Sequence, residues 1–178
     1  MSDPPAPAPG GVRECAVPPA ARARCTLAHI DYEDAFRAEA FPAQDRTGEQ
    51  WARAMLENAS QRTRSELSRG WSALGLRLDC APPDRSVLGW EIRHSAPDFV
   101  LLGARGRLGL SGELLFERQP HGLLYATFVQ LDNRVARALW TRIEARHRRV
   151  VRDLIERACY SEPAGGPPEA GRPRTRSR

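Results

Sequence analysis

Three side chains in the C-terminal half of the chain, those of Tyr125, Thr127 and His147, have the chemistry to hold or alter a small molecule. Tyr125 and Thr127 are two residues apart in an apolar segment, so in a strand both hydroxyls lie on one face. His147 falls within the apolar stripe of a helical pattern, where its ring could enter a cavity and bond a ligand or transfer a proton. A second interpretation stays open, in which His147 is a core residue bonded to backbone or strand groups and the hydroxyls belong to ordinary strand residues.

No established catalytic or metal-binding pattern accompanies these residues. The sequence has no G-x-S-x-G, no H-E-x-x-H and no carboxylate pair recognisable from spacing. The glycines of 103–109 superficially suggest a phosphate loop, but a strand is expected after them where a phosphate loop needs a helix. Cys15, Cys25, Cys80 and Cys159 form neither a C-x-x-C pair nor a zinc spacing. We therefore assign no catalytic residue and expect no metal and no cofactor.

The charge of the chain gives little reason to expect a nucleic-acid partner. The 178 residues include 27 basic residues, all of them arginine, and 22 acidic residues, for a net charge of +5. Segment 1–28 contributes +1 and segment 161–178 contributes +2, which leaves +2 for residues 29–160. That central part also lacks a strand face on which basic and aromatic residues are combined.

The two ends of the chain differ in composition from its centre. Residues 1–28 are rich in Pro, Ala and Gly, and residues 161–178 combine Pro and Gly with arginine. Segments of this kind bury too little apolar surface to fold, so we predict a disordered leader over 1–28, one folded domain over 29–160 and a disordered basic tail over 161–178. The N-terminus has no secretion signal, and no apolar run approaches about 18 residues. We therefore expect a cytoplasmic protein with reduced thiols and no membrane span.

Helices are predicted on both sides of a run of strands. Thr47 and Gln50 form a capping box, which indicates that a helical segment begins there and continues to Gly75, with a weak stretch at 58–60. A long amphipathic helix is predicted over 133–159, with Asp132 or Asn133 as its cap. Its apolar stripe contains Val135, Leu139, Trp140, Ile143, Val150, Val151, Leu154 and Ala158.

Period-two alternation between these helices predicts short strands. A short first strand is expected over 34–40, and the others over 88–93, 99–104, 108–117 and 123–131. Turns are expected at 105–107 and 119–122. Connections this short cannot join parallel strands, so the sheet should be an antiparallel meander.

These elements predict an α+β fold in which a curved antiparallel sheet wraps the long C-terminal helix and encloses an apolar cavity. Six residues are expected to bind a ligand there: Trp90, Tyr125, Thr127, Trp140, Ile143 and His147. The apolar side chains of Leu88, Ile92, Leu110 and Leu114 are expected to line or flank the same cavity.

Several short segments, in order, resemble a family of short bacterial proteins known as a domain of unknown function, number twenty-eight sixty-seven. The segments are 46–51, 70–75, 87–90, 127–129, 137–140 and 147–151. The resemblance covers about residues 31 to 158 and implies a START-like, helix-grip fold, within the superfamily of polyketide cyclases and lipid-transport proteins. It implies a cavity and an apolar ligand, and it carries over no catalytic residue.

Three hypotheses for function remain open at this point. The first is a non-catalytic protein that binds a small apolar or amphipathic molecule. The second is an enzyme of the cyclase or dehydratase type, in which His147 or Tyr125 moves a proton. The third is an interaction module whose core is filled and takes no ligand. The sequence leaves the identity of the ligand and the oligomeric state open.

Overall fold

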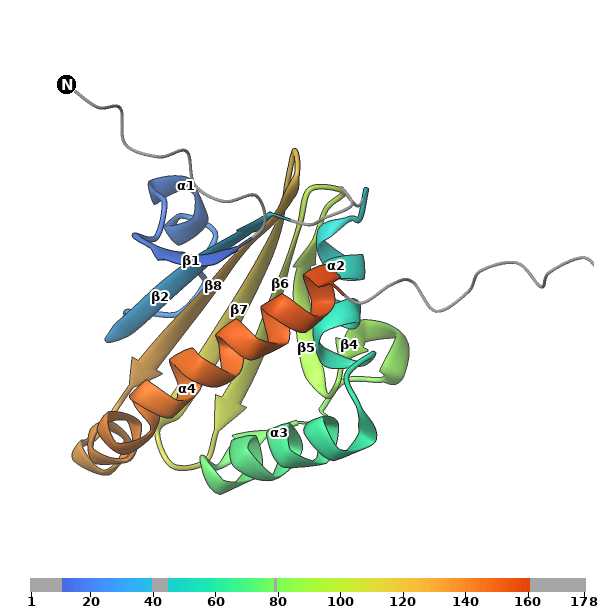
Figure 1. The fold of residues 1–178 in the computed structure, drawn as a ribbon. Helices are drawn as coiled ribbons and strands as arrows, with labels where there is room; N and C mark the ends of the chain where they lie inside the picture. The colour runs from blue at the N-terminus through green and yellow to red at the C-terminus, as the bar shows by residue number, and fades with distance from the viewer. Residues whose placement is uncertain (1–10, 40–44, 79, 161–178) are drawn as a thin grey trace, which may run out of the picture.

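The fold is α+β, with one antiparallel sheet and a long C-terminal helix that crosses it (Figure 1). This computed structural model describes residues 11–39, 45–78 and 80–160. The predicted class, an antiparallel sheet with a long C-terminal helix, is confirmed at this level. The predicted basic tail, 161–178, and the first ten residues of the predicted leader lie outside the described residues.

Over the described residues the sheet has eight strands, and those of its main path follow the order β1-β2-β8-β7-β6-β5-β4. Its strands are β1 (Val12–Cys15), β2 (Tyr32–Glu39), β3 (Leu76–Arg77), β4 (Ser86–Val87), β5 (Trp90–Ser95), β6 (Phe99–Gly106), β7 (Leu110–Gln119) and β8 (Gly122–Leu131). All pairs are antiparallel, and β3 pairs with the end of β6. The meander from β5 to β8 was predicted, whereas the pairing of β2 with β8 depends on a contact between distant parts of the chain.

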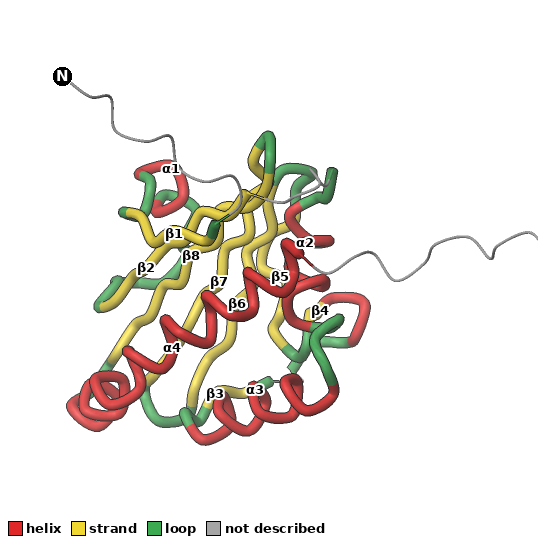
Figure 2. Tube along the Cα trace, viewed as in Figure 1, coloured by secondary structure: helices red, strands yellow, loops and turns green. Residues whose placement is uncertain are grey.

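Helices α2 (Gly48–Leu56) and α3 (Gln61–Ala73) form the single helical segment of the prediction, divided in two. The predicted capping box is present, because Thr47 accepts from the backbone of Gln50 and the Gln50 side chain accepts from the backbone of Thr47. The hydroxyl of Ser60 accepts from the backbone of Thr63 and so begins a new helix. Figure 2 shows α3 beside β3 at one end of the sheet.

Helix α4 (Arg134–Tyr160) covers the inner face of the sheet. The side-chain amide oxygen of Asn133 accepts from the backbone N–H of Ala136, which identifies Asn133 as its cap. The predicted apolar stripe is largely buried, but Val135 is 66% exposed and does not belong to it. Val135 lies in the first turn of the helix on its exposed side, whereas the next residue, Ala136, is fully buried.

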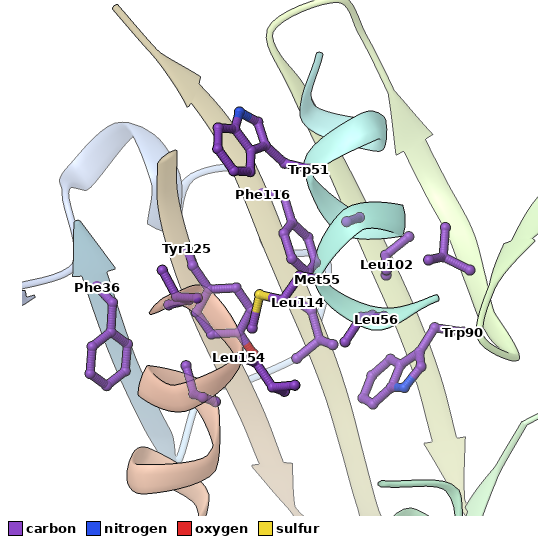
Figure 3. Packing of buried hydrophobic residues seen from close by; sticks show 14 of the residues in the cluster. Phe36, Trp51, Met55, Leu56, Trp90, Leu102, Leu114, Phe116, Tyr125 and Leu154 are labelled. Carbon is purple, nitrogen blue, oxygen red and sulfur yellow. The ribbon is translucent and has the colours of Figure 1, made fainter. Parts of the chain in front are cut away.

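The main core lies between the inner face of the sheet and the helices. Trp51, Met55 and Leu56 of α2 are almost fully buried there, against strand residues such as Leu102 and Phe116 (Figure 3). Burial of side chains of this size contributes about 1.5–3 kcal/mol each to folding. α3 contributes no fully buried residue, so it is the least firmly packed of the long helices.

The prediction of a disordered leader is wrong for residues 11–28. β1 extends the sheet beside β2, and α1 (Pro19–Arg22) lies on the outer face of the sheet. Leu101, Leu115 and Phe128 point to that face and need a cover, which the small, apolar side chain of Ala21 helps to provide. The low hydrophobicity of residues 11–28 suggested disorder. A segment that lies flat on an apolar face, however, needs only a few apolar contacts to be ordered.

The same segment buries a carboxylate on the outer face of β7. Glu113 points to the outer face, as the alternation predicts, yet it is only 2% exposed. Its carboxylate accepts from the backbone N–H of Thr26 at 2.8 Å and from the Thr26 hydroxyl. Burial of a carboxylate requires such donors, so Glu113 ties the N-terminal segment to β7.

Two strand boundaries differ from the prediction because of left-handed backbone. Leu88 and Gly89 both have positive φ and form the turn between β4 and β5, so Leu88 does not belong to the strand of Trp90. The predicted turn at 105–107 lies two residues later, at 107–109, where Gly109 has φ of 77°. No helix in the described residues is long and apolar enough to cross a membrane.

Two substitutions in α1 test whether the N-terminal segment is part of the folded domain. Ala21→Asp places a carboxylate against the outer apolar face, so we expect a loss of about 2–4 kcal/mol in the free energy of unfolding. Ala20 is the exposed neighbour, and Ala20→Asp should change stability by less than about 0.5 kcal/mol. Urea unfolding measures both, and equal effects would contradict the packing described.

Candidate functional site

A cavity of about 310 Å³ lies between the inner face of the sheet, α3 and α4. Its walls are largely apolar. They include Met55 and Leu56 of α2, Leu67, Trp71 and Leu74 of α3, Leu110, Leu114 and Val129 of the sheet, and Leu139, Val150 and Leu154 of α4. A space of this size and character is typical of a site for one small molecule.

The structure brings together all six residues predicted to bind a ligand. Trp90, Tyr125, Thr127, Trp140, Ile143 and His147 all line this cavity. Leu110 and Leu114 line it as well, whereas Leu88 and Ile92 pack against the core without lining the cavity. The displacement of Leu88 follows from its place in the β4–β5 turn.

Polar groups gather at one side of the cavity, around the hydroxyl of Thr127. The Thr127 hydroxyl donates to the hydroxyl of Tyr125 at 3.1 Å, and its oxygen lies 3.2 Å from Nε2 of His147. Tyr125 and Thr127 are adjacent on the inner face of β8, as their spacing predicts, and His147 approaches from α4. These three side chains therefore form one hydrogen-bonded group.

Asp34 completes this group, and the sequence analysis did not identify it. The β2–β8 register places Asp34 directly opposite Thr127. Its Oδ2 lies 3.3 Å from Nε2 of His147 and accepts from the hydroxyl of Tyr32 at 2.6 Å. The Asp34 side chain is 1% exposed and that of His147 is 18% exposed, so the pair is shielded from water. We call Tyr32, Asp34, Tyr125, Thr127 and His147 the polar cluster.

The cluster keeps the carboxyl group of Asp34 ionised despite its burial. Burial alone raises the pKa of a carboxyl group, but the hydrogen bonds from His147 and Tyr32 outweigh it and hold the pKa of Asp34 below its ordinary value. Burial, with Asp34 nearby, raises the pKa values of the Tyr125 and Tyr32 hydroxyls. Both tyrosines therefore keep their protons at neutral pH.

Arg148 closes the side of the cluster that faces away from the cavity. Its Nε donates to the hydroxyl of Tyr32 at 3.0 Å, and its guanidinium also pairs with Glu14 of β1 and Glu144 of α4. The Tyr32 hydroxyl thus accepts from Arg148 and donates to Asp34. The Arg148 guanidinium therefore connects β1, β2 and α4.

Aromatic rings shape the cavity near the cluster. The ring of Trp140 lies 4.8 Å from that of Tyr32 and 5.2 Å from that of His147, measured between centroids. At the far side, Trp71 of α3 packs edge-on against Trp90 of β5 at 5.4 Å. Contacts of this kind hold the rings in place, so the imidazole of His147 has a fixed orientation.

The helices that flank the cavity carry a concentrated positive charge. α3 and α4 together contain eleven arginines and four acidic residues, a charge of +7, although residues 29–160 sum to +2. Arg146 of α4 and Glu66 of α3 both line the cavity and are exposed, so they mark its mouth. The net charge of residues 29–160 does not reveal this separation, because the compensating acidic residues lie on other elements.

The polar cluster has no resemblance to a metal site. Within the described ranges, no three His, Cys, Asp or Glu side chains lie close enough together to hold a metal ion. The arrangement is instead that of a carboxylate that orients an imidazole, beside two hydroxyls. It can donate or accept hydrogen bonds and can hold a proton at a ring nitrogen.

One signal in the sequence could have identified Asp34. Tyr32, Asp34, Phe36 and Ala38 alternate along one strand, and three of the four are large or apolar, which indicates a buried face. An aspartate in such a face requires a partner. The partner, His147, is far away in the sequence, so the pairing itself could not be predicted.

Comparison of the chain with models of known protein families, with curated proteins and with solved structures finds no match.

The pH dependence of stability tests the ionised state of Asp34. A carboxyl group whose pKa is lower in the folded than in the unfolded protein stabilises the fold above its unfolded pKa, about 3.9, and this stabilisation is lost as the pH falls through the folded pKa. Asp34→Asn should therefore cost roughly 1–3 kcal/mol near pH 6, and the deficit should shrink below about pH 4.

Urea unfolding at a series of pH values measures this difference. Asp153→Asn removes an exposed carboxyl group from α4 and is the matched control, expected to change stability by less than about 0.5 kcal/mol at either pH. A deficit for Asp34→Asn that is equal at pH 6 and pH 3 would contradict an ionised Asp34.

Proposed function

We propose that this protein binds one small apolar or amphipathic molecule in the cavity between the sheet, α3 and α4. The observation that carries the proposal is the cavity itself, which is apolar over most of its wall and has one polar side. Sites for small molecules commonly combine an apolar wall with a few polar groups that fix orientation. The polar cluster supplies such groups in the hydroxyls of Tyr125 and Thr127 and the ring of His147.

We also propose that the fold is a START-like helix grip, as the family resemblance implies. Two helices lie between the first long strand and the meander, and a C-terminal helix crosses the sheet, in the order that this fold requires. The cavity lies between the sheet and that helix. The family resemblance itself stays a prediction.

The cavity favours this function over an interaction module with a filled core. That alternative requires bulky inner residues that leave no space. The inner face instead contains Gly112, where an added Cβ would lie 3.3 Å from the Trp90 ring, and α3 adds Gly70 and Ala73 to the wall. An added Cβ at Gly70 would meet no atom within 4 Å, so this part of the wall leaves space unfilled.

Substitution of a wall residue tests the proposal. Ile143 lies on the wall that α4 contributes, and Ile143→Trp should fill the cavity without removing a member of the polar cluster. We expect methyl naphthyl ketone to bind the unaltered protein with one molecule per chain, and to bind Ile143→Trp at least about tenfold more weakly. Fluorescence titration gives the affinities, and native mass spectrometry gives the stoichiometry.

The matched control is Val135→Trp, which adds the same side chain to an exposed position of the same helix. Its affinity should equal that of the unaltered protein. Equal affinities in all three proteins would show that the probe binds elsewhere and would contradict the proposal. Native mass spectrometry of the protein as purified adds a direct search for a retained natural ligand.

A second candidate function is favoured by the pairing of Asp34 with His147. Because ionised Asp34 can only accept, Nε2 of His147 carries a proton, and in the neutral ring the lone pair is on Nδ1. Among the described residues, no hydrogen bond to Nδ1 occupies that atom. A carboxylate that fixes the tautomer of a histidine beside a ligand cavity is the arrangement of a general base.

The opening of nitrobenzisoxazole tests this candidate, since the reaction requires only a base that removes one carbon-bound proton as the N–O bond breaks. We expect a rate about 10²-fold above that in buffer, lost in His147→Gln and reduced in Asp34→Asn. Release of the coloured cyanophenolate measures the rate. Equal rates for the unaltered protein and His147→Gln would exclude His147 as a base and would not contradict the proposed binding function.

A further inference from the structure

We propose that the cavity selects molecules that carry a hydrogen-bond acceptor, such as a ketone or another carbonyl group, and that the hydroxyl of Tyr125 donates to it. This inference rests on the proposed binding function and names the chemical class of the ligand. It follows from the direction of the hydrogen bonds in the polar cluster, taken one group at a time.

The first step is the pairing of Asp34 with His147. An ionised carboxylate has no proton to donate, so the 3.3 Å contact between Oδ2 and Nε2 requires the proton to be on Nε2. Tyr32 also donates to Oδ2, and it cannot reverse, because its oxygen already accepts from Nε of Arg148. Asp34 therefore sets the direction of the hydrogen bonds in the cluster.

The second step passes this direction to Thr127. Nε2 of His147 has one proton, which faces Asp34, and no lone pair, so it cannot accept from the Thr127 hydroxyl 3.2 Å away. The single proton of the Thr127 hydroxyl then points to Tyr125, whose oxygen accepts it at 3.1 Å. The Thr127 proton is thus in use within the cluster.

The third step leaves one proton without an acceptor. The hydroxyl of Tyr125 accepts from Thr127, and among the described residues no hydrogen bond gives its own proton an acceptor. Tyr125 is 2% exposed and lines the cavity. Figure 3 shows its ring beside Phe116, and the two rings pack edge-on at 5.1 Å, so the side chain cannot easily turn to another acceptor.

A buried donor without an acceptor is costly, by about 1–3 kcal/mol. A ligand with an acceptor at this position removes that cost, whereas a hydrocarbon leaves it in place. The remaining wall around Tyr125 is apolar, with Leu114, Val151 and Leu154 among its members. The preferred ligand is therefore an apolar body with a carbonyl group at its buried end.

A double comparison of two ligands and two proteins tests this inference. Methyl naphthyl ketone and isopropenylnaphthalene have nearly the same shape, but only the ketone has an acceptor oxygen. The ratio of the dissociation constant of the ketone to that of isopropenylnaphthalene should be about fivefold to tenfold higher for Tyr125→Phe than for the unaltered protein. Each ligand loses the same hydration free energy in either protein, so the difference in hydration between the two ligands cancels from this comparison.

The carbonyl stretching frequency of the bound ketone gives a second, direct measurement. It should be lower in the unaltered protein than for the ketone in heptane, and Tyr125→Phe should remove most of the shift. If Tyr125→Phe does not fold, the comparison with heptane still decides the question. The control is Phe116→Leu, which changes the packing of the Tyr125 ring and keeps its hydroxyl, and should leave the affinity ratio unchanged.

The possible outcomes separate this inference from the proposed function. Binding of both ligands with a ratio that Tyr125→Phe does not change, or an unshifted carbonyl frequency, would overturn the inference alone. That result would mean that the proton of Tyr125 is directed to Thr127. Failure of both ligands to bind the unaltered protein would overturn the proposed function and the inference together.

Discussion

The arrangement of this protein depends on one buried carboxylate. Asp34 lies between the sheet and α4, where an unpaired charge would cost several kcal/mol. His147 and Tyr32 both pair with its Oδ2, which is possible only if α4 lies on the sheet with His147 above β2 and β8. The carboxylate therefore fixes the position of α4 along and around its axis, a specification that apolar contacts alone, which are not directional, do not provide.

The cavity follows from how differently the three long helices are held. α2 is anchored by large buried side chains and α4 by both its apolar stripe and the polar cluster, whereas α3 has no fully buried residue. α3 thus lies over the sheet without closing on it, and small residues on its inner side leave the space unfilled. The part of the domain with the least packing is the part beside the mouth of the cavity, where a ligand would have to enter.

Local signals in the sequence were sufficient for most elements and insufficient for the site. The capping box at Thr47, the meander and the long C-terminal helix were predicted because each depends on neighbours in the chain. The pairing of Asp34 with His147 joins a strand near the start of the domain to a helix near its end, so no local pattern contains it. The N-terminal segment was misjudged for the same reason, since its order comes from the outer face of the sheet.

Binding and proton transfer, the two functions proposed for this cavity, would use different members of the polar cluster. Asp34 does not line the cavity, and it acts on a ligand only through the groups that it orients. In one direction it fixes Nε2 of His147 as a donor, which in the neutral ring leaves the lone pair on Nδ1; in the other, through Thr127, it leaves Tyr125 with a proton to donate. A base and a hydrogen-bond donor on one wall would act on a carbonyl compound together, the donor at the oxygen and the base at the adjacent carbon. Proton transfer would in addition require the acidic proton of such a compound to lie next to Nδ1, which is a property of the ligand rather than of the fold.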